Sequence, residues 1–379
     1  MKILNVGIIG YGFMGKVRAY GHLVLPIFYD PPPCATRITR VCDGVDAVAR
    51  KGAEILGARA VTDFREVTES PEVDIVHVCT PNHLHAEAVL SAIAHGKHVL
   101  CDKPLTLTMA DAEAIAAAIK NYGATGQMAF QTRFFPATMR AKQMITEGFL
   151  GQTLEFRAVY LHAGSADPKA PLKWKLSAAA GGGIIADLAS HVLDIVHWLL
   201  DDYAELLAAT HIAYCQRPSA DDPKHMVSVD TEDAVLILAR MKSGALGSLE
   251  ATKLATGAED ELRFEIHGSK GALRFNTMDP HHLDAYDAGA PDAPFGGTRG
   301  WTRIDAGGRY GPPAVFPGPK FAIGFLRAHL ACLASFLERS AAGQPGDPDL
   351  DQGVHVQRLM ECCKISAREG KWVTVPTQQ

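Results

Sequence analysis

GIIGYGFMG, residues 7–15, places glycines at positions 10, 12 and 15 in the spacing GxGxxG. The apolar run ILNVGII of residues 3–9 leads into this segment, and a helical pattern follows it. A strand-to-helix turn that binds a dinucleotide needs glycine for three reasons: a tight turn, close backbone approach to the pyrophosphate, and packing of the helix on the strand. Glycines also occur in ordinary turns, but after the first strand of a βα series this spacing predicts a dinucleotide-binding loop.

Strand-like and helical segments alternate through the first third of the chain. After the first strand, strand-like runs occupy 37–42, 73–80, 97–103 and 124–131, and helical patterns occupy 45–57 and 83–97. This alternation predicts a parallel sheet with helices on both faces. Later strands are longer and are joined by short glycine-containing turns, which is typical of antiparallel hairpins.

We therefore predict an α/β protein with two domains. Residues 1–135 are expected to form an N-terminal Rossmann domain with a doubly wound parallel sheet. Residues 136–379 are expected to form a C-terminal α+β domain with a large, mostly antiparallel sheet. Segment 277–320 is rich in Gly and Pro, and its length indicates a functional or interfacial loop.

The glycine loop and the end of the second strand predict the cofactor. The residues expected to bind it in the loop are Gly10, Tyr11, Gly12, Phe13, Met14 and Gly15. Asp43 ends the second strand 28 positions after Gly15, a long spacing that we assign to the proline-rich segment 26–33. A carboxylate there binds ribose hydroxyls and repels a 2′-phosphate, which favours NAD over NADP. Asp43 is also a candidate N-cap of the following helix, and the two roles are compatible.

Polar residues follow the fourth and fifth strands in the segments CTPNHLH (79–85) and CDKPL (101–105). Ligands of doubly wound sheets bind beyond the carboxyl ends of the strands. We therefore predict that the cofactor is also contacted by Thr80, Pro81, Asn82, His85, Asp102 and Lys103. A lysine just past a buried strand is often a surface side chain with a packed stem. Flanked by Asp102 and Pro104, Lys103 is better explained by a functional role.

The segment DLASHVLDIVHWL, residues 187–199, predicts a helix whose polar residues are mainly Asp and His. On an α-helix, Asp187, His191, Asp194 and Trp198 fall within about 60° of one another, opposite an apolar face. One interpretation is a solvated face with Asp187 favoured by the helix dipole. The other is a face that meets a ligand, because Asp and His are poor helix formers. Glycines at 181–183 allow close approach to the first turn.

Composition excludes several classes of protein. The 379 residues are 47% hydrophobic and carry a net charge of -5, which gives no reason to expect nucleic acid or an anionic membrane as partner. Eight cysteines occur without CxxC spacing, so we expect reduced thiols and no zinc site. The N-terminus has too short an apolar run for a signal peptide or membrane span, and we expect a cytoplasmic protein.

Four motifs together resemble one family. GxGxxG, TPNHLH (80–85), DKP (102–104) and GGGIIADLASH (181–191) occur in the order typical of Gfo/Idh/MocA oxidoreductases. The resemblance implies an NAD-dependent dehydrogenase that oxidises a secondary hydroxyl of a sugar, anhydrosugar, glycoside or cyclitol to a ketone. The usual E-K-P has Asp102 in its first position here. The segment 165–177 is most similar to the levoglucosan dehydrogenase branch, although Lys175 stands where an arginine commonly follows the tryptophan.

The resemblance also implies roles for individual residues. His191 is the expected base, since an imidazole with a pKa near 6.5 suits proton removal from a hydroxyl. Lys103 is expected to stabilise the developing alkoxide, and Asp187 to orient the imidazole or bind a sugar hydroxyl. Further substrate contacts are expected from Arg133, Trp174 and Lys175. The alternatives are a surface arginine for Arg133 and a core tryptophan for Trp174.

Three other functions are compatible with the same residues. Asp187, His191 and Asp194 could ligate a divalent metal, although Lys103 in the same cleft would repel it and we expect no metal. The fold could serve as a nicotinamide-binding sensor without turnover, or as a glycosidase that oxidises its substrate transiently with NAD. A large antiparallel sheet leaves one face exposed that another copy of the chain can cover, so we expect a homodimer or homotetramer.

Overall fold

The computed structural model describes residues 3–295, 297–307, 313 and 321–376. Contacts divide the chain into two compact units. Unit 1 contains the chain up to Phe134 and the later segment Phe325–Gln357, and unit 2 contains the segment that begins at Phe135 and the chain from Arg358 onward. The first division lies beside the predicted boundary at 135. The prediction of a single domain over 136–379 is wrong, because Phe325–Gln357 packs with the N-terminal segment.

Unit 1 is built on a six-stranded parallel sheet with the order β3-β2-β1-β4-β5-β6. Its strands are β1 (Ile3–Ile9), β2 (Ala35–Cys42), β3 (Arg59–Val61), β4 (Ile75–Val78), β5 (His98–Cys101) and β6 (Gly126–Met128). The strand order reverses between β1 and β4, and the crevice at such a reversal is where doubly wound sheets bind ligands. The predicted Rossmann architecture is confirmed.

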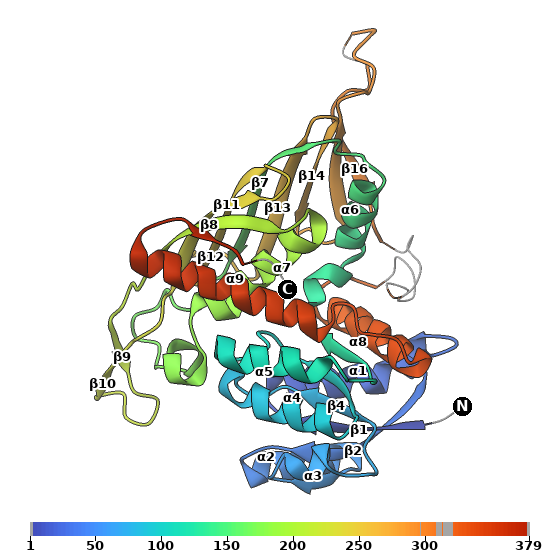
Figure 1. The fold of residues 1–379 in the computed structure, drawn as a ribbon, viewed down its shortest axis with the longest axis vertical. Coiled ribbons are helices and arrows are strands. Elements are labelled where there is room, and N and C mark those ends of the chain that lie inside the picture. The colour runs from blue at the N-terminus through green and yellow to red at the C-terminus, as the bar shows by residue number, and fades with distance from the viewer. Residues whose placement is uncertain (1–2, 296, 308–312, 314–320, 377–379) are drawn as a thin grey trace. The chain divides into compact units, whose positions relative to one another are not determined.

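Helices cover this sheet because its central strands are buried on both faces; all four residues of β4 are buried. The helical elements of unit 1 are α1 (Phe13–Phe28), α2 (Asp46–Leu56), α3 (Arg65–Thr68), η1 (Asn82–Leu84), α4 (His85–Ala94), α5 (Met109–Ile119), η2 (Gln131–Phe134), α8 (Phe325–Ala342) and the first part of α9 (Leu350–Glu369). Helix α4 packs on α5, and α1 packs on α8 (Figure 1). The proline-rich segment 26–33 begins within a helix, because α1 continues through Pro26 to Phe28.

Unit 2 is built on a nine-stranded sheet with the order β16-β15-β14-β13-β7-β12-β11-β8-β17. Its strands are β7 (Thr153–Leu161), β8 (Tyr203–His211), β11 (Ala234–Met241), β12 (Leu246–Thr252), β13 (Glu261–Gly268), β14 (Gly271–Asn276), β15 (His282–Asp287), β16 (Trp301–Asp305) and β17 (Val373–Thr374). Only the pair β12–β7 is parallel among the pairs described in this sheet, which confirms the mostly antiparallel prediction.

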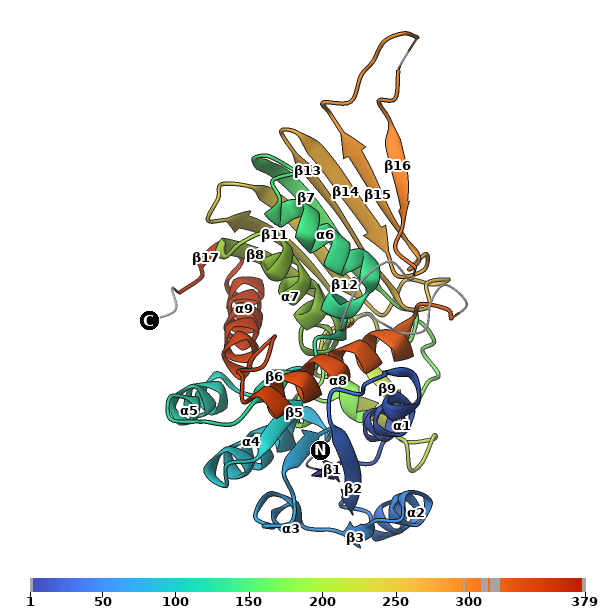
Figure 2. The ribbon, with the colours of Figure 1, turned by 90° about the vertical axis from the view of Figure 1, so that its right-hand side faces the viewer.

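One face of this sheet carries α6 and α7 (Figure 2). The remaining elements of unit 2 are α6 (Pro136–Thr146), η3 (Trp174–Leu176), η4 (Ala178–Ala180), η5 (Ile185–Ala189), α7 (Ser190–Leu199), the second part of α9 and a two-stranded sheet of β9 (Gln216–Pro218) and β10 (Met226–Ser228). In β11, buried and exposed side chains alternate, as expected for a sheet with one covered face. Leu236 and Leu238 lie on the exposed side, and the expected homo-oligomer stays a prediction.

The predicted loop 277–320 contains two strands, β15 and β16, which extend the sheet at its edge. The Gly and Pro residues are concentrated between and after these strands, and residues 296, 308–312 and 314–320 of the segment lie outside the described part. One described helical stretch, Ala178–Leu199, is long and apolar enough to cross a membrane, but 83% of its window is buried. That burial is typical of a core helix.

Candidate active site

The glycine loop of unit 1 has the geometry that dinucleotide binding requires. Gly10 has φ +87°, and a Cβ there would lie 2.7 Å from the backbone of Cys79. A Cβ on Gly15 would lie 2.1 Å from the Gly10 carbonyl oxygen. A Cβ on Gly12 would meet no atom within 4 Å. Gly10 and Gly15 are therefore required by the packing of the chain itself, whereas Gly12 leaves open the space that a pyrophosphate would occupy.

Asp43 ties the end of β2 to this loop. Its Oδ2 accepts a hydrogen bond from the Tyr11 backbone N–H at 2.9 Å, and its Oδ1 accepts one from the Val45 backbone N–H at 3.0 Å. The N-cap of α2 is Val45, without a side-chain bond, so the N-cap role of Asp43 is wrong. The carboxylate instead lies beside the glycine loop, which fits the predicted ribose contact.

His85 joins the loops that follow β4 and β5. Its Nε2 lies 2.8 Å from the Thr80 carbonyl oxygen and its Nδ1 lies 2.9 Å from the Pro104 carbonyl oxygen, and a neutral imidazole donates its one N–H to one of them. The ring is fully buried, and burial lowers its pKa while the two carbonyls act in the opposite direction. His85 therefore packs between the backbone segments that follow β4 and β5. Its direct contact with the cofactor stays a prediction, as do those of Pro81 and Asn82, which follow β4.

Asp102 lies in the interior of unit 1. Its Oδ1 accepts a hydrogen bond from the Lys103 backbone N–H at 2.9 Å, and its Oδ2 lies 3.9 Å from a guanidinium nitrogen of Arg18. Arg18 is buried on α1 and also contacts His329 Nδ1 at 3.2 Å. The carboxylate thus supports the backbone that carries Lys103. Sequence reasoning missed Arg18, although a lone arginine on a helix otherwise packed on a sheet was an available signal.

Arg133 is buried in η2, and its guanidinium donates to Gln352 Oε1 at 3.0 Å. The surface-arginine alternative is therefore wrong. Its predicted substrate contact remains untested.

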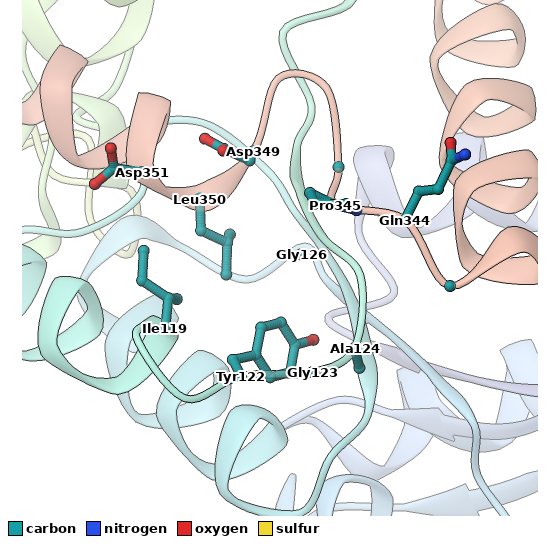
Figure 3. A pocket seen from close by; sticks show the side chains of 12 residues that line it. Ile119, Tyr122, Gly123, Ala124, Gly126, Gln344, Pro345, Asp349, Leu350 and Asp351 are labelled. Atoms are coloured by element: carbon teal, nitrogen blue, oxygen red, sulfur yellow. The ribbon is translucent and has the colours of Figure 1, made fainter.

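A separate cavity of about 240 Å³ in unit 1 does not belong to this constellation (Figure 3). It is lined by the end of α5, the chain leading into β6 and the α8–α9 connection, including Tyr122, Gly126 and Leu350. Because Tyr122 precedes β6 and Gly126 is its first residue, the cavity lies at the amino end of this strand. Ligands of this fold bind at the opposite edge.

In unit 2, the predicted helix begins with a π-helical turn, η5, before the α-helix α7. A π turn is wider than an α-helical turn, which changes the angle between successive side chains. The α-helical prediction that Asp187 and His191 share one narrow face is therefore not accurate. Asp187, His191 and Asp194 expose only 9%, 3% and 0% of their surfaces. A solvated face is therefore wrong, and Asp194 lies inside the unit.

The glycines that precede η5 lack a side chain, and this allows the chain to pack closely against other residues of unit 2. A Cβ on Gly182 would lie 2.5 Å from the Lys175 backbone, and one on Gly183 would lie 2.7 Å from Glu232 Oε1. Glu232 accepts hydrogen bonds from the first N–H groups of the turn: its Oε1 from Ile185 at 3.0 Å and its carbonyl from Ile184 at 3.1 Å. Glu232 therefore anchors the turn that carries Asp187.

Two lysines bind the Asp187 carboxylate. Lys175 Nζ donates to Oδ1 at 3.0 Å and to Oδ2 at 3.1 Å, and Lys253 Nζ lies 2.6 Å from Oδ2. Sequence reasoning named Lys175 but missed Lys253, which directly follows β12. Two ammonium groups compete with any cation for this carboxylate, which argues against a divalent metal at Asp187, His191 and Asp194.

Aromatic rings flank these charges. The Tyr160 ring lies 5.6 Å from the His191 ring, and its hydroxyl donates to Asp260 at 2.7 Å. Burial, followed by the charge of Asp260, raises the pKa of Tyr160 well above its usual value. Trp174 is 41% exposed, so the core-tryptophan alternative is wrong. Lys175 Nζ lies 5.8 Å from the Trp174 ring centroid.

Unit 1 thus has the fold and loop geometry of a dinucleotide-binding Rossmann protein, and unit 2 adds a mixed sheet with a buried charged cluster. The chain belongs to the Gfo/Idh/MocA family of oxidoreductases. The model of the oxidoreductase family with an NAD-binding Rossmann fold matches residues 4–130, and the GFO/IDH/MocA C-terminal domain model matches residues 138–274. The predicted enzyme class and NAD-binding domain are confirmed.

Named relatives resemble the chain over all or most of its length. Levoglucosan dehydrogenase of Pseudarthrobacter phenanthrenivorans is 33% identical, with 99% of each chain covered. The scyllo-inositol 2-dehydrogenase (NAD(+)) of Bacillus subtilis is 29% identical over 60% of this chain and 62% of its own. A solved structure of levoglucosan dehydrogenase with NADH and levoglucosan has a TM-score of 0.92 at 32% identity, covering 99% of this chain and 100% of that one.

Proposed function

We propose that this protein is an NAD-dependent dehydrogenase that oxidises a secondary hydroxyl of a sugar, anhydrosugar, glycoside or cyclitol to a ketone. The observation that carries the proposal is the full-length similarity, in sequence and fold, to levoglucosan dehydrogenase, whose solved structures include complexes with NADH and with levoglucosan. The inositol dehydrogenases among the relatives extend the candidate substrates to cyclitols.

The residues of unit 1 fit the cofactor. Gly12 leaves the approach to the loop open, and the Asp43 carboxylate is fixed next to the same loop by the Tyr11 N–H. A fixed carboxylate at the end of the second strand favours ribose hydroxyls over a 2′-phosphate. We therefore propose NAD as the preferred cofactor. When bound, NAD accepts the hydride that leaves the carbinol carbon of the substrate.

His191 is the proposed base, and Lys103 its electrostatic partner. Loss of hydride from the carbinol carbon requires loss of the hydroxyl proton, and a neutral imidazole can take that proton. An ammonium beside the same oxygen stabilises its alkoxide character as the proton leaves. The loop that carries Lys103 is contacted from both sides, by the Asp102 carboxylate at the Lys103 N–H and by the buried His85 ring at the Pro104 carbonyl. A restrained loop is suited to presenting one charge at one position.

Asp187, Trp174 and Lys175 are the proposed substrate contacts in unit 2, together with His191. A sugar presents both hydroxyls and an apolar ring face, and an exposed indole with a neighbouring ammonium matches both features. Trp174 and Lys175 are each nearly half exposed and therefore accessible to such a ligand. Arg133 is proposed as a further contact from the family resemblance alone.

The proposed function is tested by measuring NADH formation at 340 nm with a panel of anhydrosugars, aldoses, cyclitols and glycosides. We expect stoichiometric NADH and ketone from at least one anhydrosugar or cyclitol. A glycosidase would instead release sugar without net NADH, and a sensor would bind NAD without turnover. Either result would overturn the proposal.

A further inference from the structure

The two lysines that bind Asp187 differ in their surroundings. Lys175 lies in η3, before the π turn, and its side chain is 47% exposed. Lys253 follows β12, and its side chain is 11% exposed. Two ammonium groups of unequal burial thus share one carboxylate.

The backbone of Lys253 is fixed on both sides. Its N–H donates to the Asp233 carbonyl at 2.9 Å, and its carbonyl accepts from the Ser165 N–H at 2.9 Å. Strand β12, which leads to it, lies between β7 and β11 in the middle of the sheet. The position from which Lys253 extends is therefore set by the sheet register.

Burial changes how strongly each lysine depends on Asp187. An ammonium removed from water is costly unless a carboxylate compensates it, and removal of one partner leaves the other charge buried. An exposed pair contributes little, because water screens it and long side chains lose entropy. The short, buried contact with Lys253 should therefore fix the carboxylate, while Lys175 can exchange Asp187 for another acceptor.

We propose that Lys253 is a positioning residue of the substrate site: its buried ammonium holds the Asp187 carboxylate in place on the π turn that precedes His191. Lys175, on the exposed side of the same carboxylate, is the lysine that contacts the substrate. The proposal deepens the function given above and rests on it for its kinetic consequence. The unequal coupling of the two lysines to Asp187 does not depend on any substrate.

The coupling is measured by double-mutant cycles on denaturant unfolding. The variants are Lys253→Met, Lys175→Met, Asp187→Asn and the two double variants. We expect a coupling of at least about tenfold in the unfolding equilibrium constant (about 1.4 kcal/mol) for Lys253 with Asp187. For Lys175 with Asp187 we expect less than about threefold. Should Lys253→Met fail to fold, Lys253→Met/Asp187→Asn should restore folding by removing the buried carboxylate charge that has lost its buried ammonium partner.

The kinetic consequence is measured with a substrate identified by NADH formation. Lys253→Met should lower kcat by about tenfold to a hundredfold, and Lys253→Arg, which keeps the charge, should recover part of that loss. Lys175→Met should act mainly on KM. The matched control is Lys242→Met, which breaks an exposed Lys–Asp pair with Asp202 elsewhere in unit 2 and should leave both constants unchanged.

Separate outcomes overturn the two claims. Equal coupling of the two lysines to Asp187, or a Lys253→Met/Asp187→Asn protein that still fails to fold, contradicts the positioning role whatever the enzyme does. With a confirmed substrate, native kcat in Lys253→Met or a loss that Lys253→Arg does not recover also contradicts it. If no substrate in the panel yields NADH, the proposed dehydrogenase function fails, and the coupling measurement still decides the role of Lys253.

Discussion

The glycine loop of unit 1 and the charged cluster of unit 2 are built in different ways. The loop is formed by backbone, and its shape is set by a few neighbouring residues, with Gly10 in a left-handed conformation and Gly15 against the Gly10 carbonyl. The cluster is formed by side chains from distant segments, with Lys175 and Lys253 meeting at Asp187. A backbone site depends on the absence of side chains, whereas a charged cluster depends on each partner being present. Substitutions should therefore affect the two regions differently.

The largest difference is expected in catalysis. His191→Ala or Lys103→Ala should lower kcat by about 10² to 10⁴, because each removes a group that acts on the reacting hydroxyl. His191→Ala should leave the Kd for NAD nearly unchanged, since His191 belongs to unit 2 and the glycine loop to unit 1. Steady-state kinetics and NAD titration measure the two effects. A His191→Ala enzyme with near-native kcat would remove the imidazole from the mechanism.

Gly12→Ala should separate cofactor binding from folding. The added methyl meets no protein atom within 4 Å, and the only stability cost is that alanine is a poorer N-cap of α1 than glycine, so the free energy of unfolding should fall by no more than about 1 kcal/mol. The same methyl fills the approach to the loop, and the Kd for NAD should rise by about tenfold to a hundredfold.

The matched control for this variant is Gly123→Ala, at another glycine of unit 1 where a Cβ meets nothing within 4 Å. It should change neither stability nor NAD affinity. Unchanged NAD affinity in Gly12→Ala would show that the open space does not receive the cofactor.

The difference between the backbone loop of unit 1 and the side-chain cluster of unit 2 also explains which features could be predicted from the sequence. The Rossmann sheet and the glycine loop follow from patterns within short segments, because alternation and glycine spacing are local, and the Asp43 position follows from the end of the second strand. Lys253 could not be predicted, because its meeting with Asp187 depends on the register of β12 between β7 and β11. The π turn was missed because the sequence pattern of residues 184–200 satisfies an ordinary α-helix equally well.

Burial of ionisable groups was also beyond reach of the sequence. Arg133, Asp194 and Arg18 belong to residue types that are mostly exposed, yet all three are buried here. Their burial depends on partners from other elements, such as Gln352 for Arg133. Arg18, a lone arginine on a helix packed on a sheet, is the one of the three with a signal in the sequence; for Arg133 and Gln352 neither member of the pair is unusual by itself.

A smaller effect is expected for the preference between NAD and NADP, which depends on Asp43 beside the glycine loop. The Asp43 carboxylate, held beside the glycine loop, should give NAD at least about a tenfold advantage over NADP in kcat/KM. Asp43→Ser should reduce this preference, because it removes the negative charge that repels a 2′-phosphate. The ratio is measured with one substrate and both cofactors. Equal or better turnover of the native enzyme with NADP would leave Asp43 a structural residue that joins Tyr11 and Val45.

The smallest effect is expected in the pH dependence of the free energy of unfolding, which buried titratable groups determine. Whereas unit 2 buries an ion pair, unit 1 buries two histidines in contact: His22 Nε2 lies 2.7 Å from His77 Nε2, and His22 Nδ1 lies 2.9 Å from Thr36 Oγ1. Burial, and then the nearby Arg18, lowers the pKa of His22 to about 3, and burial also lowers the pKa of His77 well below its usual value.

Both histidines are therefore neutral in the folded protein and take up protons on unfolding below about pH 6.5. Their contribution to stability is complete above that pH and is lost as the pH falls toward the folded pKa. Each histidine should add a slope of up to about 1.4 kcal/mol per pH unit to the free energy of unfolding. His22→Gln keeps hydrogen-bonding groups but cannot titrate, so its acid slope should be shallower by that amount between pH 6.5 and 4.5. Urea unfolding across this range measures the slope, and the same slope in His22→Gln as in the native protein would mean that His22 does not stay neutral inside unit 1.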